Sequence, residues 1–258
     1  MINNAGLPTV RFFVMIYIIL FQTIIVAFHV QSITMKNMKF KCIIFDLDGT
    51  LVDTIKDIAA SMNYGLESRG FPAPSLEKYT KIVGQGIRKL ASLALPPSAQ
   101  DDQTVDAVTK EALSYYKDHP AVYAAPYPGI VEVVTELRMK KVKTAVLSNK
   151  ADSISKIIIA KLFPPNSFDM VIGEQPNVPR KPDPTSTWDI LTEMDVSPRE
   201  ALFVGDSEID VATAHAAECS ALGVSWGFRG RKILENAGAD RIIDSPAEII
   251  ELMNIRYS

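Results

Sequence analysis

Residues 41–54 read KCIIFDLDGTLVDT and contain the first predicted strand of the chain. Five residues form a short, mostly apolar run, and acidic and glycine residues follow it at once. Such a run predicts a buried strand that leads into a loop. Five similar runs follow along the chain, the last of them weaker: 143–147, 169–172, 201–204, 221–224 and 241–243.

Helical patterns separate most of these predicted strands. They cover residues 130–139, 152–162, 185–194 and 209–217. Alternating strands and helices are joined by right-handed crossovers, which produces a parallel sheet with helices on both faces. The chain is therefore predicted to be an α/β protein with a doubly wound, Rossmann-like parallel sheet.

Residues 55–125 break this alternation, because they hold helical patterns and no convincing strand. The patterns cover residues 55–69, 76–82, 86–93 and 104–116. Pro126, Pro128 and Gly129 mark the end of the segment. We therefore expect an inserted all-helical domain at 55–125 and an α/β core made of residues 35–54 and 126–258. Inserted modules of this kind commonly act as lids.

Composition excludes several classes of protein. With 47% hydrophobic residues and a net charge of only -3, the chain is too apolar for disorder and too weakly charged to bind nucleic acid electrostatically. Its two cysteines, Cys42 and Cys219, lie far apart without a metal-binding pattern, which excludes a disulfide framework and a zinc site. We expect both to be buried small apolar residues in a reducing, cytoplasmic protein.

Residues 1–34 form an apolar extension with one charged side chain, Arg11. The uncharged stretch 12–35 is long enough to cross a bilayer, which takes about 20 mostly apolar residues. Three interpretations stay open: sequence upstream of a true start at Met35 or Met38, a membrane anchor, or a cleaved signal peptide. A membrane partner is expected only for an anchor, and three lysines at residues 36–41 would then keep the catalytic domain in the cytoplasm.

Charged and polar residues follow several of the predicted strands. Ligands bind beyond the carboxyl ends of the strands in an open parallel sheet, so these residues are expected to converge at one edge. The first strand leads into DLDGT at 46–50, the second into SNK at 148–150, and the fourth into GDSEID at 205–210, while Lys181 precedes the helix before the fourth strand.

A cluster of buried carboxylates is unfavourable unless a cation lies among them. Hard oxygen ligands in this number suit Mg²⁺, which keeps some waters and accepts oxygens from a substrate phosphate. A phosphate in turn needs a cation, a hydroxyl and backbone N–H groups, which Lys181, Ser148 and the loop amides can supply. The strand ends therefore predict a site for a metal and a phosphate, where a carboxylate can act as a covalent nucleophile.

The order of these motifs resembles the haloacid dehalogenase superfamily of phosphotransferases, over roughly residues 39–250. The run FDLDGTLVDT, SNK, the lysine of KPDP and GDSEID carry the resemblance. It implies that the helical insertion is that superfamily's small α-helical cap. It also implies phosphomonoester hydrolysis through an aspartyl-phosphate.

Roles follow from the resemblance position by position. Asp46 matches the nucleophile, and Asp48 matches the acid/base that protonates the leaving alcohol and then activates water. Asp206 and Asp210 match metal positions, alongside the Asp46 carboxylate and the carbonyl oxygen of Asp48. The phosphate-binding positions are matched by Ser148, Asn149 and Lys181.

Further motifs resemble the phosphoglycolate phosphatases of the superfamily, with 2-phosphoglycolate as the first candidate substrate. They are VGQG at 83–86, YPG at 127–129, LSNK at 147–150 and VSWGFR at 224–229. The resemblance implies substrate contacts at Gly84, Gln85 and Gly86, although the glycines equally suit a turn between two helices. Arg88 and Arg229 are expected to be solvated surface residues.

Related reactions remain as alternatives on the same motifs: an inorganic pyrophosphatase, a sugar phosphatase or a β-phosphoglucomutase-like phosphotransferase. A signalling receiver domain shares the doubly wound sheet, but receivers are shorter and lack a helical cap. No histidine lies at a strand end, which disfavours a Ser-His-Asp hydrolase. The sequence predicts a small phosphorylated metabolite as partner and leaves the oligomeric state open.

Overall fold

A computed structural model describes residues 40–254 of the chain. The apolar N-terminal extension, and with it the three interpretations of a mis-assigned start, an anchor or a signal peptide, lies outside the described residues. Among residues 40–254, no helix combines the length and the hydropathy that a membrane crossing requires.

A six-stranded sheet forms the core, in the order β5-β4-β1-β6-β7-β8. Every pairing in it is parallel. The strands are β1 (Cys42–Phe45), β4 (Lys143–Ala151), β5 (Met170–Glu174), β6 (Ala201–Gly205), β7 (Ser220–Val224) and β8 (Arg241–Ile243). Strand order therefore reverses at β1, which confirms the predicted doubly wound sheet.

Strand β4 differs most from its predicted extent, because it continues for four residues beyond Leu147. Its pairing with β5 is irregular between Leu147 and Ala151, and Ala151 then lies opposite Glu174. Residues 148–150 consequently belong to the strand end and not to a loop beyond it.

The helices of the core are α6 (Ile130–Met139), α7 (Asp152–Leu162), α8 (Thr185–Glu193), α9 (Glu208–Ala216), α10 (Arg231–Ala237) and α11 (Ala247–Asn254). The first four match predicted helices within one residue at each end. Helices α10 and α11, of seven and eight residues, were not among the predicted segments.

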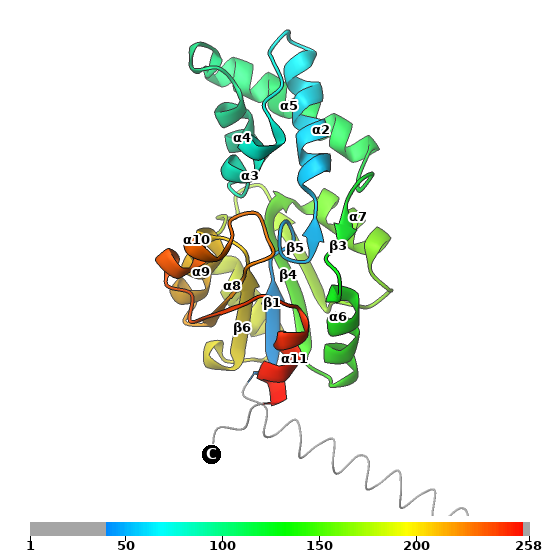
Figure 1. Cartoon of the computed structure of the whole chain (residues 1–258), viewed down its shortest axis with the longest axis vertical. Helices are drawn as coiled ribbons and strands as arrows, with labels where there is room; N and C mark the ends of the chain where they lie inside the picture. The colour runs from blue at the N-terminus through cyan, green and yellow to red at the C-terminus, as the bar shows by residue number, and fades with distance from the viewer. Residues whose placement is uncertain (1–39, 255–258) are drawn as a thin grey trace, which may run out of the picture. The chain divides into compact units, whose positions relative to one another are not determined.

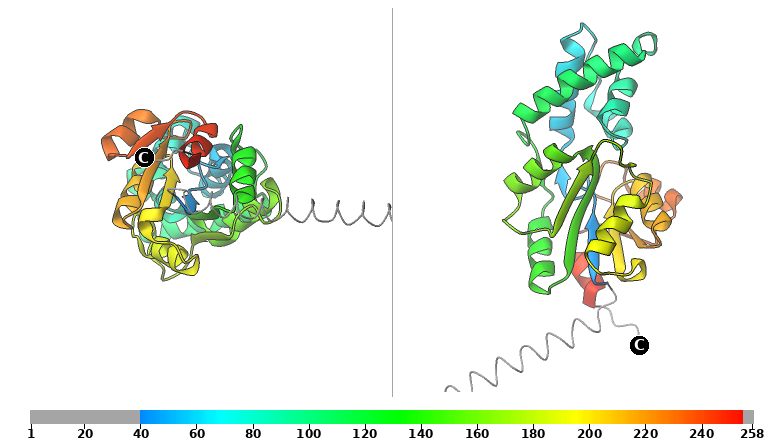
Figure 2. Two further views of the ribbon diagram at one scale, coloured as in Figure 1. Left: turned by 90° about the horizontal axis from the view of Figure 1, so that it is seen from below. Right: turned by 180° about the vertical axis from the view of Figure 1, so that it is seen from behind.

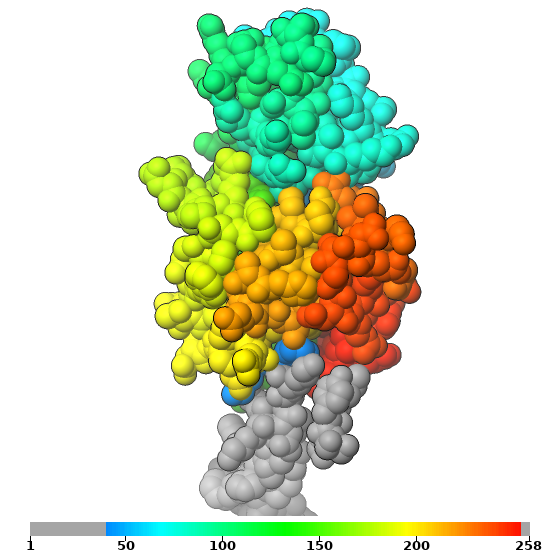
Figure 3. Space-filling view, turned by 90° about the vertical axis from the view of Figure 1, so that its left-hand side faces the viewer, coloured from blue at the N-terminus to red at the C-terminus, as the bar shows by residue number. Residues whose placement is uncertain are grey.

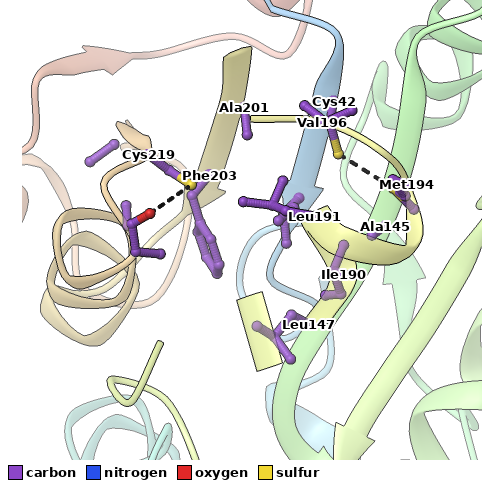
Figure 4. Close-up of a cluster of buried hydrophobic side chains, with 14 of the residues drawn as sticks. Cys42, Ala145, Leu147, Ile190, Leu191, Met194, Val196, Ala201, Phe203 and Cys219 are labelled. Carbon is purple, nitrogen blue, oxygen red and sulfur yellow. Dashed lines mark hydrogen bonds between the residues drawn. The ribbon is translucent and has the colours of Figure 1, made fainter. Parts of the chain in front are cut away.

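Both faces of the sheet are buried, which explains why its strands are continuously apolar. Cys42 and Ile44 point to one face and Ile43 and Phe45 to the other, and all four side chains are inaccessible to solvent. On the first face, residues of α8, α9 and α10 pack against β1, β4, β6 and β7 (Figure 4).

Both cysteines are free and buried, as predicted (Figure 4). Burial raises the pKa of the Cys42 thiol to about 12 and that of Cys219 to about 11. The Cys42 thiol lies 3.5 Å from the sulfur of Met194 on the C-terminal side of α8. These thiols are packing groups and not nucleophiles at neutral pH.

Four α-helices and a short 3-10 helix (Pro97–Ala99) lie between β2 (Val52–Asp53) and β3 (Ala125–Pro126) and form a segment that we call the cap. The α-helices are α2 (Ile55–Glu67), α3 (Leu76–Ile82), α4 (Ile87–Ala94) and α5 (Asp102–Asp118). Front and back views show them beyond one end of the strands of the main sheet (Figures 1 and 2). β2 and β3 pair antiparallel and so join the segment that enters the cap to the segment that leaves it. Sequence patterns missed these two-residue strands.

Asp57, in the first turn of α2, links the segment that enters the cap to the segment that leaves it. Its carboxylate accepts hydrogen bonds from the backbone N–H groups of Val122 (2.9 Å), Tyr123 (3.1 Å to each oxygen) and Ala124 (2.6 Å). The side chain is buried, with only 3% of the residue exposed. Three N–H donors of the exit segment thus depend on one carboxylate of the entry helix.

We expect Asp57→Asn to lower the free energy of unfolding by about 2–3 kcal/mol. Hydrogen bonds to an ionised acceptor contribute about 1.5–3 kcal/mol, and the amide group of Asn adds donors where further acceptors are needed. Chemical denaturation followed by circular dichroism measures the change. Asp118→Asn, at the exposed end of α5, is the matched control, and equal denaturation midpoints for the two variants would contradict the assignment.

Candidate active site

The predicted site residues meet at the carboxyl edge of the sheet, where the strand order reverses. Asp46 follows the central strand β1, Ser148 lies at the end of its neighbour β4, and Asp206 follows β6 on the other side. This is the position at which open α/β sheets bind ligands. The fold itself therefore brings the three motifs together from distant parts of the sequence.

Three of the predicted metal residues form a buried carboxylate triad. Asp46, Asp206 and Asp210 each place a carboxylate oxygen within 4.8 Å of those of the other two. All three residues are buried. The carboxylate of Asp48 does not belong to this triad and instead pairs with Lys150.

The electrostatics of the triad fit a bound cation. Burial raises the pKa of Asp46 to about 7, and the neighbouring carboxylates of Asp210 and Asp48 add to the shift against the lowering effect of Lys181. Burial likewise raises the pKa of Asp206 well above its ordinary value, and Asp210 and Asp46 add to it. Lys181 supplies one positive charge to Asp46 and Asp210. A divalent cation among these oxygens would supply the further positive charge that three carboxylates need.

Lys181 lies inside the carboxylate cluster. Its Nζ is 2.7 Å from Asp210 Oδ1 and 2.8 Å from Asp46 Oδ1. Burial acts to lower the pKa of Lys181, but Asp210 and Asp46 outweigh it and hold the pKa above its usual value. The ammonium group therefore stays charged beside Asp46, where it can meet a phosphate oxygen.

Local structure holds Asp210 and Lys181 in place. Asp210 is the third residue of α9 and forms a capping box with Ser207, whose Oγ donates to Asp210 Oδ2 at 2.6 Å. This bond leaves Asp210 Oδ1 for Lys181. Asn149 Oδ1 accepts from the backbone N–H of Lys181 at 2.9 Å, and Asn149 Nδ2 donates to the Lys181 carbonyl at 3.0 Å. In this structure the Asn149 amide thus positions Lys181.

The loop after β1 approaches Asp206 so closely that only glycine fits at residue 49. Gly49 has a φ of +85°, and a Cβ added there would lie 2.5 Å from Asp206 Oδ2. On the other side, the backbone N–H of Phe228 donates to Asp206 Oδ2 at 2.7 Å. The loop that follows β7 therefore orients Asp206.

Asp48 has its own buried partner, Lys150, which sequence reasoning did not select. Lys150 Nζ donates to both carboxylate oxygens of Asp48, at 3.0 and 3.2 Å, and Thr54 Oγ1 donates to Oδ1 at 2.6 Å. Ser148 is buried, and its Oγ accepts from the backbone N–H of Lys150 at 3.2 Å. The SNK motif contained Lys150, but spacing alone did not show that its side chain returns to Asp48.

The predicted cap residues lie in the turn between α3 and α4. Gly84 and Gly86 have φ values of +116° and +82° and line the cavity over the site. Core side chains hold this turn by its carbonyl groups: Asn149 Nδ2 donates to that of Gly84 at 2.9 Å, and Arg180 Nη1 donates to that of Gln85 at 3.0 Å. The Gln85 side chain is exposed and does not line the cavity.

Arg229 corrects the expectation of a solvated surface arginine. Only 11% of its side chain is exposed, because its guanidinium donates to the carbonyls of Thr80 (2.6 Å) and Val83 (2.8 Å) at the end of α3. Its Nε also pairs with Glu208 at 3.3 Å. The sequence could not show that the C-terminal end of α3 would lie over the loop after β7, which carries Arg229. Arg88, by contrast, is a surface residue, as expected.

We expect Arg229→Gln to loosen the cap. The variant leaves two carbonyls at the end of α3 without their charged donor, so amide hydrogen exchange in residues 79–86 should become at least tenfold faster, which corresponds to about 1.4 kcal/mol. Hydrogen exchange with mass spectrometry measures it. Arg88→Gln, which removes an exposed arginine of the cap, is the control, and equal exchange in wild type and Arg229→Gln would show that Arg229 does not restrain the cap.

A cavity lies between the cap and the strand ends. Its floor is made of the charged residues described above, and its cap side is mostly apolar. The apolar lining of the cap side consists of Ile58, Val83, Ile87, Leu90 and Leu113. A space-filling view shows the cap, in cyan and green, against the yellow and orange surface of the core (Figure 3). Such a cavity suits a small ligand with a strongly anionic end.

The carboxylate triad and the buried lysine suit a metal ion and a phosphate group at the edge of a doubly wound sheet. Residues 43–224 match the family described as haloacid dehalogenase-like hydrolase. This match covers most of the chain, so the chain belongs to the haloacid dehalogenase-like hydrolase family.

Similar proteins narrow the class to the phosphatases of that family. A phosphoglycolate phosphatase of Aquifex aeolicus is 31% identical over 83% of this chain and 97% of its own length. Phosphoglycolate phosphatase 1 of Pseudomonas aeruginosa is 32% identical over 76% of this chain and 74% of its own length. The solved structure of a predicted phosphoglycolate phosphatase from Haemophilus somnus has a TM-score of 0.77 at 27% identity and covers 83% of this chain and 98% of its own.

Proposed function

We propose that the protein is a Mg²⁺-dependent phosphomonoesterase that hydrolyses 2-phosphoglycolate to glycolate and phosphate. The observation that carries the proposal is the Lys181 ammonium, 2.8 Å from Asp46 inside a buried carboxylate triad. This arrangement offers a cation for a phosphate next to a carboxylate that can attack it. The relatives named above supply the choice of substrate.

The first half of the proposed reaction transfers the phosphoryl group to the protein. An Asp46 carboxylate oxygen forms a bond to phosphorus while the bond between phosphorus and the ester oxygen breaks. Asp48 acts as the general acid in this step: it gives a proton to the leaving oxygen and becomes a carboxylate. Lys181 neutralises part of the phosphoryl charge, with the Ser148 hydroxyl and nearby backbone N–H groups as further donors.

The second half releases phosphate. The Asp48 carboxylate takes a proton from water, the water oxygen bonds to phosphorus, and the bond between phosphorus and Asp46 breaks, which regenerates both side chains. Mg²⁺ held by Asp46, Asp206 and Asp210, with the Asp48 carbonyl oxygen as the resemblance implies, would offset the negative charge of phosphate and nucleophile. Lys150 and Thr54 orient Asp48 for both proton transfers.

The same proposal assigns residues 55–125 to a cap domain and residues 35–54 and 126–258 to the catalytic core. A cap that covers the site would exclude bulk water and large phosphoproteins. We place the enzyme in the cytoplasm, because its two cysteines are free and buried. The weak net charge of -3 supports a small metabolite and no nucleic acid as its partner.

A substrate panel tests the proposal. Phosphate release with Mg²⁺ is measured on 2-phosphoglycolate, pyrophosphate, hexose phosphates and β-glucose 1-phosphate. We expect kcat/KM on 2-phosphoglycolate to exceed the others at least tenfold. A flat profile would replace the narrow substrate with a broad phosphatase activity, and a preference for pyrophosphate, a hexose phosphate or mutase turnover would select one of the alternatives.

A further inference from the structure

Tyr116 on α5 lines the cavity. The residue is only 3% exposed, and its phenolic oxygen forms no hydrogen bond of good geometry with residues 40–254. Buried tyrosine hydroxyls usually have a partner, because an unpaired one loses its hydrogen bonds to water without replacement. Burial raises the pKa of Tyr116 to about 12, so the hydroxyl is a proton donor at neutral pH.

A cation lies over the ring of Tyr116. Lys150 Nζ is 4.5 Å from the centre of the Tyr116 ring, and its side chain is 7% exposed. Core and cap therefore each bring one group to the same place, a cation from β4 and a hydroxyl donor from α5. Most other cap residues that line the cavity are apolar. A donor and a cation in apolar surroundings suit a small anionic group.

The two buried lysines pair with aspartates of one short loop, the loop after β1. Lys181 pairs with Asp46, and Lys150 pairs with Asp48, two residues further on. Two residues of extended chain span at most about 7 Å. One small molecule can thus place one anionic group near each lysine.

We propose that Tyr116 and Lys150 bind the carboxylate of the substrate and select phosphomonoesters that carry an acidic group next to the ester carbon. This inference rests on the proposed function and extends it, since it assigns the end of the substrate opposite the phosphate. Asp48 protonates the ester oxygen of phosphoglycolate, and the carboxylate is attached to the adjacent carbon. Lys150, bound to Asp48, lies on the side where that carboxylate would be.

The test compares two esters that differ in the carboxylate. Wild type and Tyr116→Phe are assayed with Mg²⁺ on 2-phosphoglycolate and on ethyl phosphate, which has the same phosphate and two carbons but no acidic group. We expect the ratio of kcat/KM on phosphoglycolate to that on ethyl phosphate to fall about tenfold in the variant, mainly through KM on phosphoglycolate. Lys150→Gln should lower the same ratio, because it removes the charge and keeps a donor for Asp48.

Tyr115→Phe is the matched control. Tyr115 is the preceding residue of α5 and stacks on Tyr64 and His119 instead of lining the cavity. Its variant should keep the wild-type ratio. A purely structural role of Tyr116 would slow both esters equally and leave the ratio unchanged, and that result would overturn the inference while the proposed function stands.

A binding measurement separates the two proposals if turnover fails. Calorimetric titration of Asp46→Asn with Mg²⁺ and each ester needs no hydrolysis. Tighter binding of phosphoglycolate than of ethyl phosphate, lost when Tyr116→Phe is added, would support the carboxylate site even for a different reaction. Equal binding of both esters would overturn it.

Discussion

Asp46→Asn is expected to lower kcat on 2-phosphoglycolate at least 10⁴-fold, because the amide cannot form the covalent bond to phosphorus. Removal of a nucleophile from a working site typically costs at least this much. The fold should survive, because asparagine has nearly the same shape as aspartate. Burial already disfavours the charged form of Asp46 and raises its pKa to about 7, so a neutral side chain is tolerated there. Phosphate release and the thermal unfolding midpoint without metal measure the two effects.

Asp53→Asn serves as the control for Asp46→Asn. Asp53 belongs to the same DLDGTLVD run but is exposed and accepts a bond from the backbone N–H of Ile55 at 3.3 Å. Its variant should hydrolyse the ester at close to the wild-type rate. Residual turnover of Asp46→Asn above 1% of wild type, after deamidation is excluded by mass spectrometry, would refute Asp46 as the nucleophile.

Removal of divalent metal is expected to abolish hydrolysis and to change the pH dependence of stability. The pKa of Asp46 rises from its ordinary 3.8 to about 7 on folding, and that of Asp206 also rises. The folded, metal-free protein therefore holds protons that the unfolded chain releases. The stability from these protonated groups is complete below about pH 4 and is lost as the pH rises through 7.

Mg²⁺ should consequently stabilise the protein more at pH 8 than at pH 5.5, where protons compete for the same carboxylates. At a concentration about 100-fold above its Kd, a bound ion adds about 2.7 kcal/mol, or roughly 5–10 °C in Tm for a domain of this size. Differential scanning calorimetry with and without Mg²⁺ measures the shift. Asp206→Asn should lose this shift, and Asp189→Asn, at an exposed position of α8, should keep it. An equal shift in both variants would place the metal elsewhere.

The sheet followed from local sequence, and the small connecting elements did not. Each strand of the main sheet coincides with a short apolar run that has a distinct boundary, as at 42–45 and 201–204. Such runs therefore identified all six strands. β2 and β3 have two residues each, and they pair where the segment that enters the cap lies beside the segment that leaves it. Their pairing depends on a tertiary contact that no local pattern contains.

The same distinction applies to the site. Four aspartates and Lys181 were predicted to meet because strand ends of a parallel sheet lie at one edge, and the structure brings three of those carboxylates and Lys181 together. Tyr116 and Arg229 depend instead on where the cap lies over the core. Tyr116 is one of two adjacent tyrosines in its helix, and the guanidinium of Arg229 gains its two carbonyl partners from the end of α3. Their sequence neighbourhoods carry no sign of either contact.

Trapping of the phosphorylated enzyme tests the central claim most directly. Wild-type protein is mixed with ³²P-labelled phosphoglycolate and Mg²⁺ and quenched in acid within milliseconds, and its peptides are mapped by mass spectrometry. We expect acid-stable label on the peptide that contains Asp46, removed by hydroxylamine as for an acyl phosphate, and no label in Asp46→Asn. Steady hydrolysis without a labelled peptide, or label on another residue, would contradict catalysis through Asp46.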